Sequence, residues 1–102
     1  MVNSKIVIIE TTVSSNKDAK KLANTLLDQK LIACANITKT QSVYNWKNKK
    51  YDETEFLVSI KTSKDKKQIA IQSIKKIHPY ELPMIVVKEI ETTKEYQEWI
   101  EK

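Results

Sequence analysis

Hydrophobic positions along the chain follow two different periods, and the changes of period divide it into strands and helices. Ile6 to Ile9 form an apolar run that predicts a buried strand continuing to about Thr12. Ser14-Ser15-Asn16 follow as candidate helix caps. Small and apolar residues then recur at helical spacing: Ala19, Leu22, Ala23, Leu26 and Leu27. The pattern predicts a strand followed by an amphipathic helix with one core face.

After Lys30 the period changes to two, which is typical of a strand with two different faces. One face carries Ala33, Ala35 and Ile37, and the other carries Ile32, Cys34 and Asn36. Extended character continues to Trp46, and Lys47-Asn48-Lys49 is predicted to form the hairpin turn. Asn48 is the residue best able to adopt the left-handed conformation in a chain without glycine. The return strand alternates an apolar set, Phe56, Val58 and Ile60, with Leu57, Ser59 and Lys61.

The remaining third of the chain predicts a helix, a strand and a second helix. Ser63 is a candidate cap for a helix that stops at Pro79 and buries an apolar face: Ile69, Ala70, Ile74 and Ile77. Met84 to Ile90 is predicted to be the last strand. A capping box, Thr92-x-x-Glu95, then opens a terminal helix with Tyr96, Trp99 and Ile100 on one face.

The predicted order is βαββαβ with an added C-terminal helix, and it predicts an α+β, ferredoxin-like fold with an antiparallel sheet. The 102 residues fit a single domain, residues 1–102, with one core. The central hairpin, from about Ile32 to Thr62, is longer than two short helices can cover. Aromatic residues on it would be an aggregation hazard if exposed, so Tyr44, Trp46 and Tyr51 are predicted to form subunit contacts.

Composition excludes several classes of protein. Apolar residues make up 40% of the chain and charged residues 30%, a globular balance. No apolar run approaches the roughly 20 residues of a membrane helix, and the start of the chain lacks the apolar region of a signal peptide. One cysteine cannot form an internal disulfide, which suits a reducing compartment. We therefore expect a cytoplasmic protein that does not interact with membranes.

The net charge of +5 comes entirely from lysine, because the chain has no arginine. The lysines are spread along the sequence, which favours an ordinary solvated surface. The βαββαβ order is shared with RNA recognition motifs, but the stretch from Lys50 to Phe56 lacks their glycine and carries three carboxylates. The absence of glycine also excludes glycine-rich phosphate loops. We expect no nucleic-acid partner and no organic cofactor.

His78-Pro79-Tyr80-Glu81-Leu82-Pro83 holds the only histidine and both prolines, and it is predicted to be a stiff connector between helix and strand. It places an imidazole, a phenol and a carboxylate close together, where a ligand or metal could bind. His78 could instead cap the helix end, and Glu81 could pair with a lysine. Cys34 could be a small buried apolar residue rather than a ligand.

A closed tetrahedral zinc site needs four protein ligands, and the chain has a single Cys and a single His. A weak site at a subunit boundary, formed by His78, Glu81 and Cys34, is the alternative that we favour. Copper(II) is the divalent ion such a site would prefer, although copper also binds adventitiously. Nothing in the sequence places Cys34 beside His78 as a nucleophile and its base, so no enzymatic activity is expected.

Several motifs together resemble the CutA family, the divalent cation tolerance proteins. They are Ala33-Cys34-Ala35-Asn36-Ile37, Tyr44-x-Trp46, Glu53-x-Glu55, Lys61-Thr62, His78-Pro79-Tyr80-Glu81-x-Pro83 and Tyr96-x-x-Trp99-Ile100. The resemblance covers nearly the whole chain. Asn48 replaces the glycine common in the family's hairpin. Thr11 and Ile77 replace a cysteine and a histidine of some bacterial members, so a metal site here would have fewer soft ligands.

The resemblance implies a very stable homotrimer built by intersubunit strand pairing, with a role linked to copper and other divalent metals. The architecture also resembles the trimeric PII signalling proteins. An alternative function is therefore a small-molecule sensor that binds an anionic metabolite in the cleft between subunits.

Overall fold

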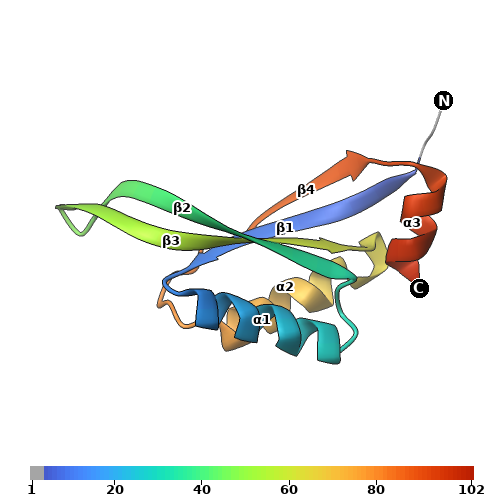
Figure 1. Ribbon diagram of the computed structural model, residues 1–102, viewed down its shortest axis with the longest axis horizontal. Helices are drawn as coiled ribbons and strands as arrows, with labels where there is room; N and C mark the ends of the chain where they lie inside the picture. The colour runs from blue at the N-terminus through green and yellow to red at the C-terminus, as the bar shows by residue number, and fades with distance from the viewer. Residues whose placement is uncertain (1–3) are drawn as a thin grey trace.

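The computed structural model describes residues 4–102, which form the predicted order of elements with one added 3-10 turn (Figure 1). The elements are β1 (Lys5–Val13), α1 (Asn16–Asp28), β2 (Cys34–Trp46), β3 (Lys49–Thr62), η1 (Lys64–Lys66), α2 (Lys67–Ile77), β4 (Val86–Glu91) and α3 (Lys94–Glu101). The predicted α+β class with a C-terminal helix is confirmed.

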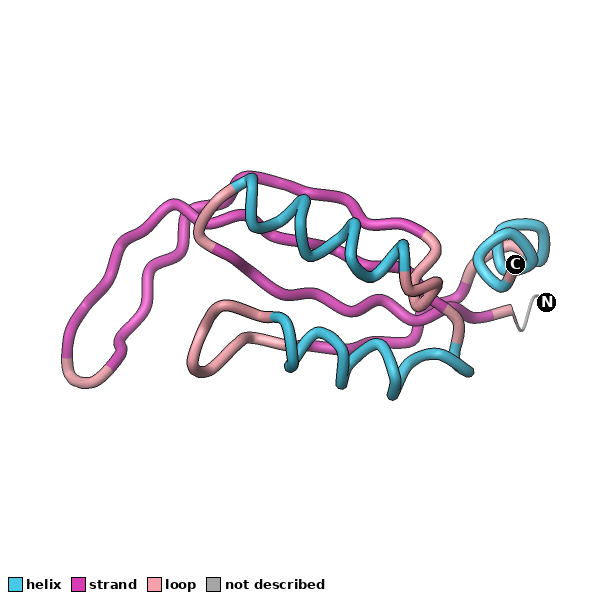
Figure 2. Tube along the Cα trace, turned by 90° about the horizontal axis from the view of Figure 1, so that it is seen from below, coloured by secondary structure: helices cyan, strands magenta, loops and turns pink. Residues whose placement is uncertain are grey.

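The four strands form one antiparallel sheet in the order β2-β3-β1-β4. In the centre of the sheet Ile9 pairs with Ile60 of β3 and with Val87 of β4. Helices α1 and α2 lie side by side on one face of the sheet (Figures 1 and 2). This arrangement is the ferredoxin-like fold that the sequence predicts.

The hydrophobic core lies between the sheet and these two helices. Its buried members are Val7, Ile9, Val13, Ala19, Leu22, Leu26, Ile32, Val58, Ile60, Ala70 and Ile74. Each large aliphatic side chain of this kind contributes about 1.5–3 kcal/mol to folding when it is fully buried. Ala70 and Ile74 anchor α2 in this core, and the His78–Pro83 connector follows the helix directly.

Two residues predicted to face the core are exposed instead. Leu27 is 39% exposed and Ile69 is 60% exposed, whereas their neighbours Leu26 and Ala70 are completely buried. Successive residues of a helix differ by about 100° in direction. The buried face of each helix is therefore narrower than the set of apolar residues that the sequence analysis assigned to it.

The ends of the helices also differ slightly from the prediction. Ser15 caps α1, and its Oγ accepts a 3.0 Å hydrogen bond from the Asp18 N–H. The cap of α3 is Thr93, whose Oγ1 accepts the Tyr96 N–H, and not Thr92 as predicted. Thr92 still donates its N–H to the Ser4 carbonyl, so the chain leaves the sheet one residue later.

Among the described residues, no helix is long and apolar enough to cross a membrane.

The hairpin turn contains two residues, Lys47 and Asn48, because β3 already begins at Lys49. Both have positive φ, 52° and 62°, as a type I′ turn requires. The left-handed conformation predicted for Asn48 is confirmed. That of Lys47 was not predicted, since lysine carries no sequence signal for it.

The hairpin extends well beyond the rest of the sheet, as Figures 1 and 2 show. β2 and β3 pair from Cys34 opposite Lys61 to Trp46 opposite Lys49. β1, however, pairs with β3 only as far as Val13 opposite Phe56. On the side of β3 opposite β2, residues 49–55 therefore lack a neighbouring strand within residues 4–102.

Candidate functional site

The connector after α2 begins at His78 because proline follows it. A residue before proline is excluded from helical geometry, and His78 accordingly has φ −69° and ψ 134°. Its backbone N–H still closes the last helical turn on the Ile74 carbonyl at 2.9 Å. The histidine side chain is thereby directed away from the helix and toward the end of β1.

Both nitrogens of the His78 ring are hydrogen-bonded within the chain. Nε2 lies 3.0 Å from the Thr12 carbonyl oxygen, and Nδ1 lies 3.1 Å from the Tyr80 backbone nitrogen. A carbonyl can only accept and a backbone N–H can only donate. The ring is therefore neutral, with its proton on Nε2, and its Nδ1 lone pair is occupied.

His78 is only 8% exposed, and this burial lowers the pKa of the imidazole below its ordinary value of 6.5. The hydrogen bond to Thr12 and the negative charge of Glu55 act in the opposite direction but are weaker. At neutral pH the side chain carries no charge. His78 consequently joins the connector to β1 as a neutral hydrogen-bonding group.

Tyr80 links the same connector to the base of the hairpin. Its hydroxyl donates a 2.6 Å hydrogen bond to Glu55 Oε2, and Glu55 is only 6% exposed. Burial, and then this carboxylate, raise the pKa of Tyr80 well above its usual value. The Tyr80 ring also packs edge-on against His78, with the ring centres 5.0 Å apart. One buried carboxylate is thus held by a tyrosine that the histidine helps to position.

A second tyrosine–carboxylate pair lies further along the same face of the hairpin. Tyr44 donates a 2.6 Å hydrogen bond to Glu53 Oε1, and this bond is the main cause that raises the pKa of Tyr44 to about 12. Tyr44 also stacks on Tyr51 across the strand pair, with the ring centres 5.3 Å apart. Ion pairs among residues 4–102 involve only Glu89, so neither Glu53 nor its neighbour Glu55 is neutralised by a lysine there.

The three predicted metal ligands are not all brought together in one chain. Cys34 pairs with Lys61 of β3, and Lys61 pairs in turn with Ile8 of β1. Ile8 lies four residues before Thr12, whose carbonyl is hydrogen-bonded to His78. Four strand residues span roughly 13 Å. The half-buried Cys34 instead lies near α3, with its Sγ 3.9 Å from the Tyr96 hydroxyl.

Glu81 follows His78 in the connector and is exposed. Within residues 4–102 no group of three or more His, Cys, Asp or Glu side chains is arranged to hold a metal ion. Both ring nitrogens of His78 are already hydrogen-bonded, which further reduces the number of ligands available to a metal ion. The side chains of residues 4–102 in a single chain therefore do not fit a closed metal site.

Glu55 is the central residue that the sequence analysis did not assign to the site, whereas the phenol of Tyr80 was expected in the connector close to His78. Glu55 lies on the same face of β3 as Leu57 and Ser59, opposite the face that packs into the core. The alternation of apolar and polar residues therefore did not predict its burial. The occurrence of Glu55 in the Glu53-x-Glu55 motif was the only available indication of its role. The predicted subunit-contact residues do lie on the projecting hairpin, where Tyr44 is 40% and Trp46 36% exposed.

Comparisons with known proteins agree with this arrangement. The CutA1 divalent ion tolerance protein family matches residues 7–102. A divalent-cation tolerance protein CutA of Pyrococcus horikoshii is 32% identical over 96 residues, which cover 93% of this chain and 94% of that protein.

Two solved structures are similar over almost their whole length. CutA1 from Ehrlichia chaffeensis has a TM-score of 0.89 at 36% identity and covers 98% of this chain and 94% of its own. A protein from Nostoc sp. PCC 7120, described as PII-like CutA, has a TM-score of 0.88 at 28% identity and covers 93% of both chains. Other relatives are named periplasmic, in Archaeoglobus fulgidus, or chloroplastic, in Arabidopsis thaliana. The family therefore does not correspond to one compartment.

Proposed function

Because this chain belongs to the CutA1 divalent ion tolerance protein family, we propose that it acts as a non-catalytic homotrimer in the response to divalent metal ions. Each subunit contributes one domain, and the reducing cytosol is the compartment that the single cysteine favours. The observation that carries the proposal is the projecting hairpin, whose exposed edge and aromatic residues need a partner. The separation of Cys34 from His78 supports a function without nucleophilic catalysis.

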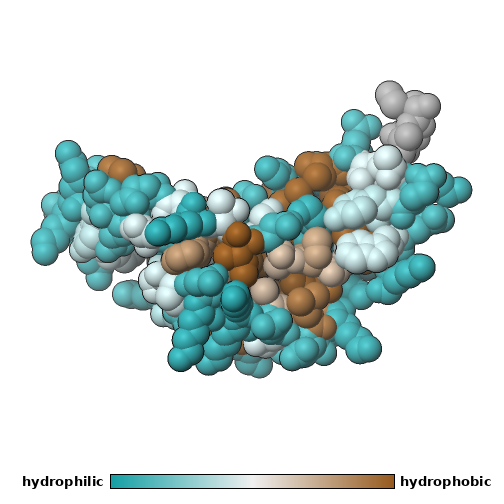
Figure 3. Space-filling view, in the orientation of Figure 1, coloured by the Kyte–Doolittle hydropathy of each residue, from teal (hydrophilic) through white to brown (hydrophobic). Residues whose placement is uncertain are grey.

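The free strand edges within residues 4–102 include the outer edge of β2, and two others are the surfaces proposed for assembly. The first is the edge of β3 between residues 49 and 55, and the second is the outer edge of β4, the last strand of the sheet. Unpaired strand edges readily accept another strand. Apolar side chains on and before β4 are also exposed, including Leu82 at 67%, Val86 at 49% and Val87 at 38%. In Figure 3 apolar surface gathers where Figure 1 places β4. Hairpin-to-edge pairing between subunits would cover both surfaces.

Sedimentation equilibrium tests the assembly. A trimer has three times the 11.9 kDa mass of the chain, and a monomer at micromolar concentration would contradict the proposal. Trp46→Lys should weaken the trimer, because it places a charge in an apolar contact. Leu27→Lys is the matched control, since Leu27 is similarly exposed but lies on α1, away from both edges.

For copper(II) we propose weak binding, with His78 as the principal ligand and Glu81 as a nearby carboxylate. The imidazole must break one of its two hydrogen bonds before it can ligate, which costs about 0.5–1.5 kcal/mol and lowers the affinity. A contribution from Cys34 would have to come from a neighbouring subunit. Calorimetry on His78→Ala tests the assignment. Unchanged copper affinity and pH dependence in a trimeric variant would show that the metal binds elsewhere.

The second candidate function is a PII-like sensor that binds a small anionic metabolite between subunits. It is favoured by the similarity to the Nostoc protein described as PII-like. On the face of the sheet opposite α1 and α2, Lys61 hydrogen-bonds to Asn36 and supplies a positive charge for such a ligand. Calorimetry with a metabolite panel and with copper on one preparation separates the two functions. Saturable heat from a metabolite that is lost in Lys61→Gln would favour the sensor.

A further inference from the structure

The net charge of the protein is concentrated on one layer of the fold. The segments 16–28 and 64–77, which form α1, η1 and α2, contain eight lysines and three aspartates. Their excess of five equals the +5 of the whole chain, so the other residues are balanced. Lysines that are dispersed along the sequence are thus gathered by the fold on the helical layer.

Only part of this charge is neutralised nearby. Lys64 and Lys67 lie 3.6 Å and 3.9 Å from the carboxylate of Glu89 on β4. Among the described residues no other lysine forms an ion pair, so Lys75 and Lys76 in the last turn of α2 project into solvent without a carboxylate partner. Positive charge on one face attracts acidic partners and accelerates their association.

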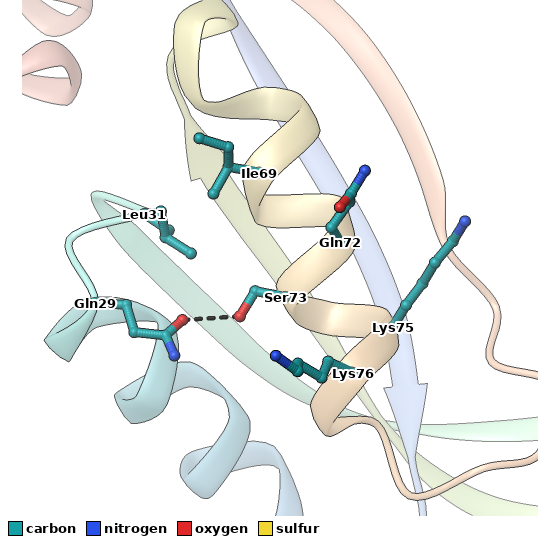
Figure 4. Close-up of a pocket in the computed structure, with 7 residues that line it drawn as sticks. All are labelled: Gln29, Leu31, Ile69, Gln72, Ser73, Lys75 and Lys76. Carbon is teal, nitrogen blue, oxygen red and sulfur yellow. Dashed lines mark hydrogen bonds between the residues drawn. The ribbon is translucent and has the colours of Figure 1, made fainter.

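An open groove of about 640 Å³ lies in this layer, between the end of α1 and α2. A 2.8 Å hydrogen bond from Ser73 Oγ to Gln29 Oε1 joins the two helices across it (Figure 4). Leu31 and Ile69 provide apolar surface on one side of this bond, and Ile69 is 60% exposed. Lys76 extends on the α1 side of α2. The groove combines apolar, amide and cationic groups, and no carboxylate lines it.

We propose that this groove is a docking site for an acidic, amphipathic peptide segment of a partner protein. An apolar side chain of the segment covers Ile69 and Leu31, and carboxylates on its flanks approach Lys75 and Lys76. Gln72 also lines the groove, and its amide can form a hydrogen bond with the backbone of the segment. The site lies on the helical face of the sheet, apart from the hairpin and the β4 edge, so trimer assembly leaves it open.

A peptide fits this surface better than the other anionic partners do. The apolar residues lie in a recess that admits a side chain, whereas an anionic membrane would meet a flat or convex surface. The chain also lacks arginine and presents no aromatic side chain in the groove, both of which nucleic-acid sites use. Charge complementarity and the recess together select an acidic peptide.

Fluorescence anisotropy with a labelled synthetic peptide tests the proposal on the 102-residue chain. The peptide has leucines at helical spacing and glutamates at the flanking positions, and a version with glutamine in place of glutamate is compared with it. We expect saturable binding of the acidic peptide that weakens as salt increases. Lys75→Glu/Lys76→Glu should reduce the affinity at least about tenfold, and Ile69→Gln should also reduce it.

The matched control is Lys5→Glu/Lys94→Glu, which changes the net charge equally at exposed positions outside the groove. Equal losses in both double variants would show a non-specific charge effect and overturn the proposal, as would failure of the acidic peptide to bind. Binding to phosphatidylserine vesicles without binding to the peptide would identify a membrane surface instead. Circular dichroism verifies that each variant is folded.

Discussion

The Tyr80 hydroxyl donates a 2.6 Å hydrogen bond to Glu55, and this bond joins the connector after α2 to the base of the hairpin. The carboxylate is 6% exposed and, within residues 4–102, has no lysine partner. Burial of a charged group is costly unless donors compensate it. The tyrosine therefore stabilises the place where the projecting hairpin leaves the sheet.

Removal of that hydroxyl is expected to destabilise the protein. Tyr80→Phe should lower the free energy of unfolding by about 1.5–3 kcal/mol, because Glu55 loses its hydrogen-bond donor. Urea denaturation at one fixed protein concentration measures the change. Tyr96→Phe is the control and should have little effect, because the Tyr96 hydroxyl makes only a 3.9 Å contact with the Cys34 sulfur. Equal losses in the two variants would contradict this role of Glu55.

The buried His78 should make stability depend on pH. Its pKa in the folded state lies below the ordinary 6.5, so the unfolded chain binds a proton first as the pH falls. The contribution of the neutral His78 to the free energy of unfolding should be fully present above about pH 6.5. It should decrease as the pH drops toward the folded-state pKa. His78→Ala, which removes the only histidine, should abolish this decrease. An NMR titration that gave an imidazole pKa above 6.5 would show that the sign is wrong.

Two buried threonines should respond in opposite ways to the same substitution. Thr11 is fully buried, and its hydroxyl has no hydrogen-bond partner among the described residues. Thr11→Val should raise the free energy of unfolding by about 1 kcal/mol, because it removes an unsatisfied polar group. Thr62→Val should lower it by a similar amount, because the Thr62 hydroxyl donates a 2.7 Å hydrogen bond to the Leu31 carbonyl. Thermal and urea unfolding of both variants provide the comparison, and equal changes would refute the assignment.

Adjacent leucines of α1 test the boundary of the core. Leu26→Ala should cost about 2–5 kcal/mol of stability, because this side chain is completely buried. Leu27→Ala should cost less than about 1 kcal/mol, since Leu27 is 39% exposed. Chemical denaturation of the two variants under identical conditions measures the difference. Similar losses would mean that Leu27 is covered in the assembled protein.

The sequence alone determined the order of the elements and the faces of most of them. The periods of apolar residues predicted every strand and helix, because side-chain direction within an element depends only on local geometry. Pro79 and the left-handed Asn48 likewise act on their own backbone, so the end of α2 and the position of the turn could be predicted. Errors of one or two residues remained at Thr92, Met84 and Lys49, where hydrogen bonds and strand pairing with other elements decide the boundary.

Only the tertiary structure decided what the candidate site contains. The strand register separates Cys34 from His78, and the packing of the connector against the base of the hairpin brings Glu55 to Tyr80, although the two residues are 25 positions apart. The same packing placed two partners on the ring of His78 and gathered dispersed lysines onto one layer. Such contacts join residues that are distant in sequence. They depend on the register and packing of whole elements, which the apolar pattern of a single element does not specify.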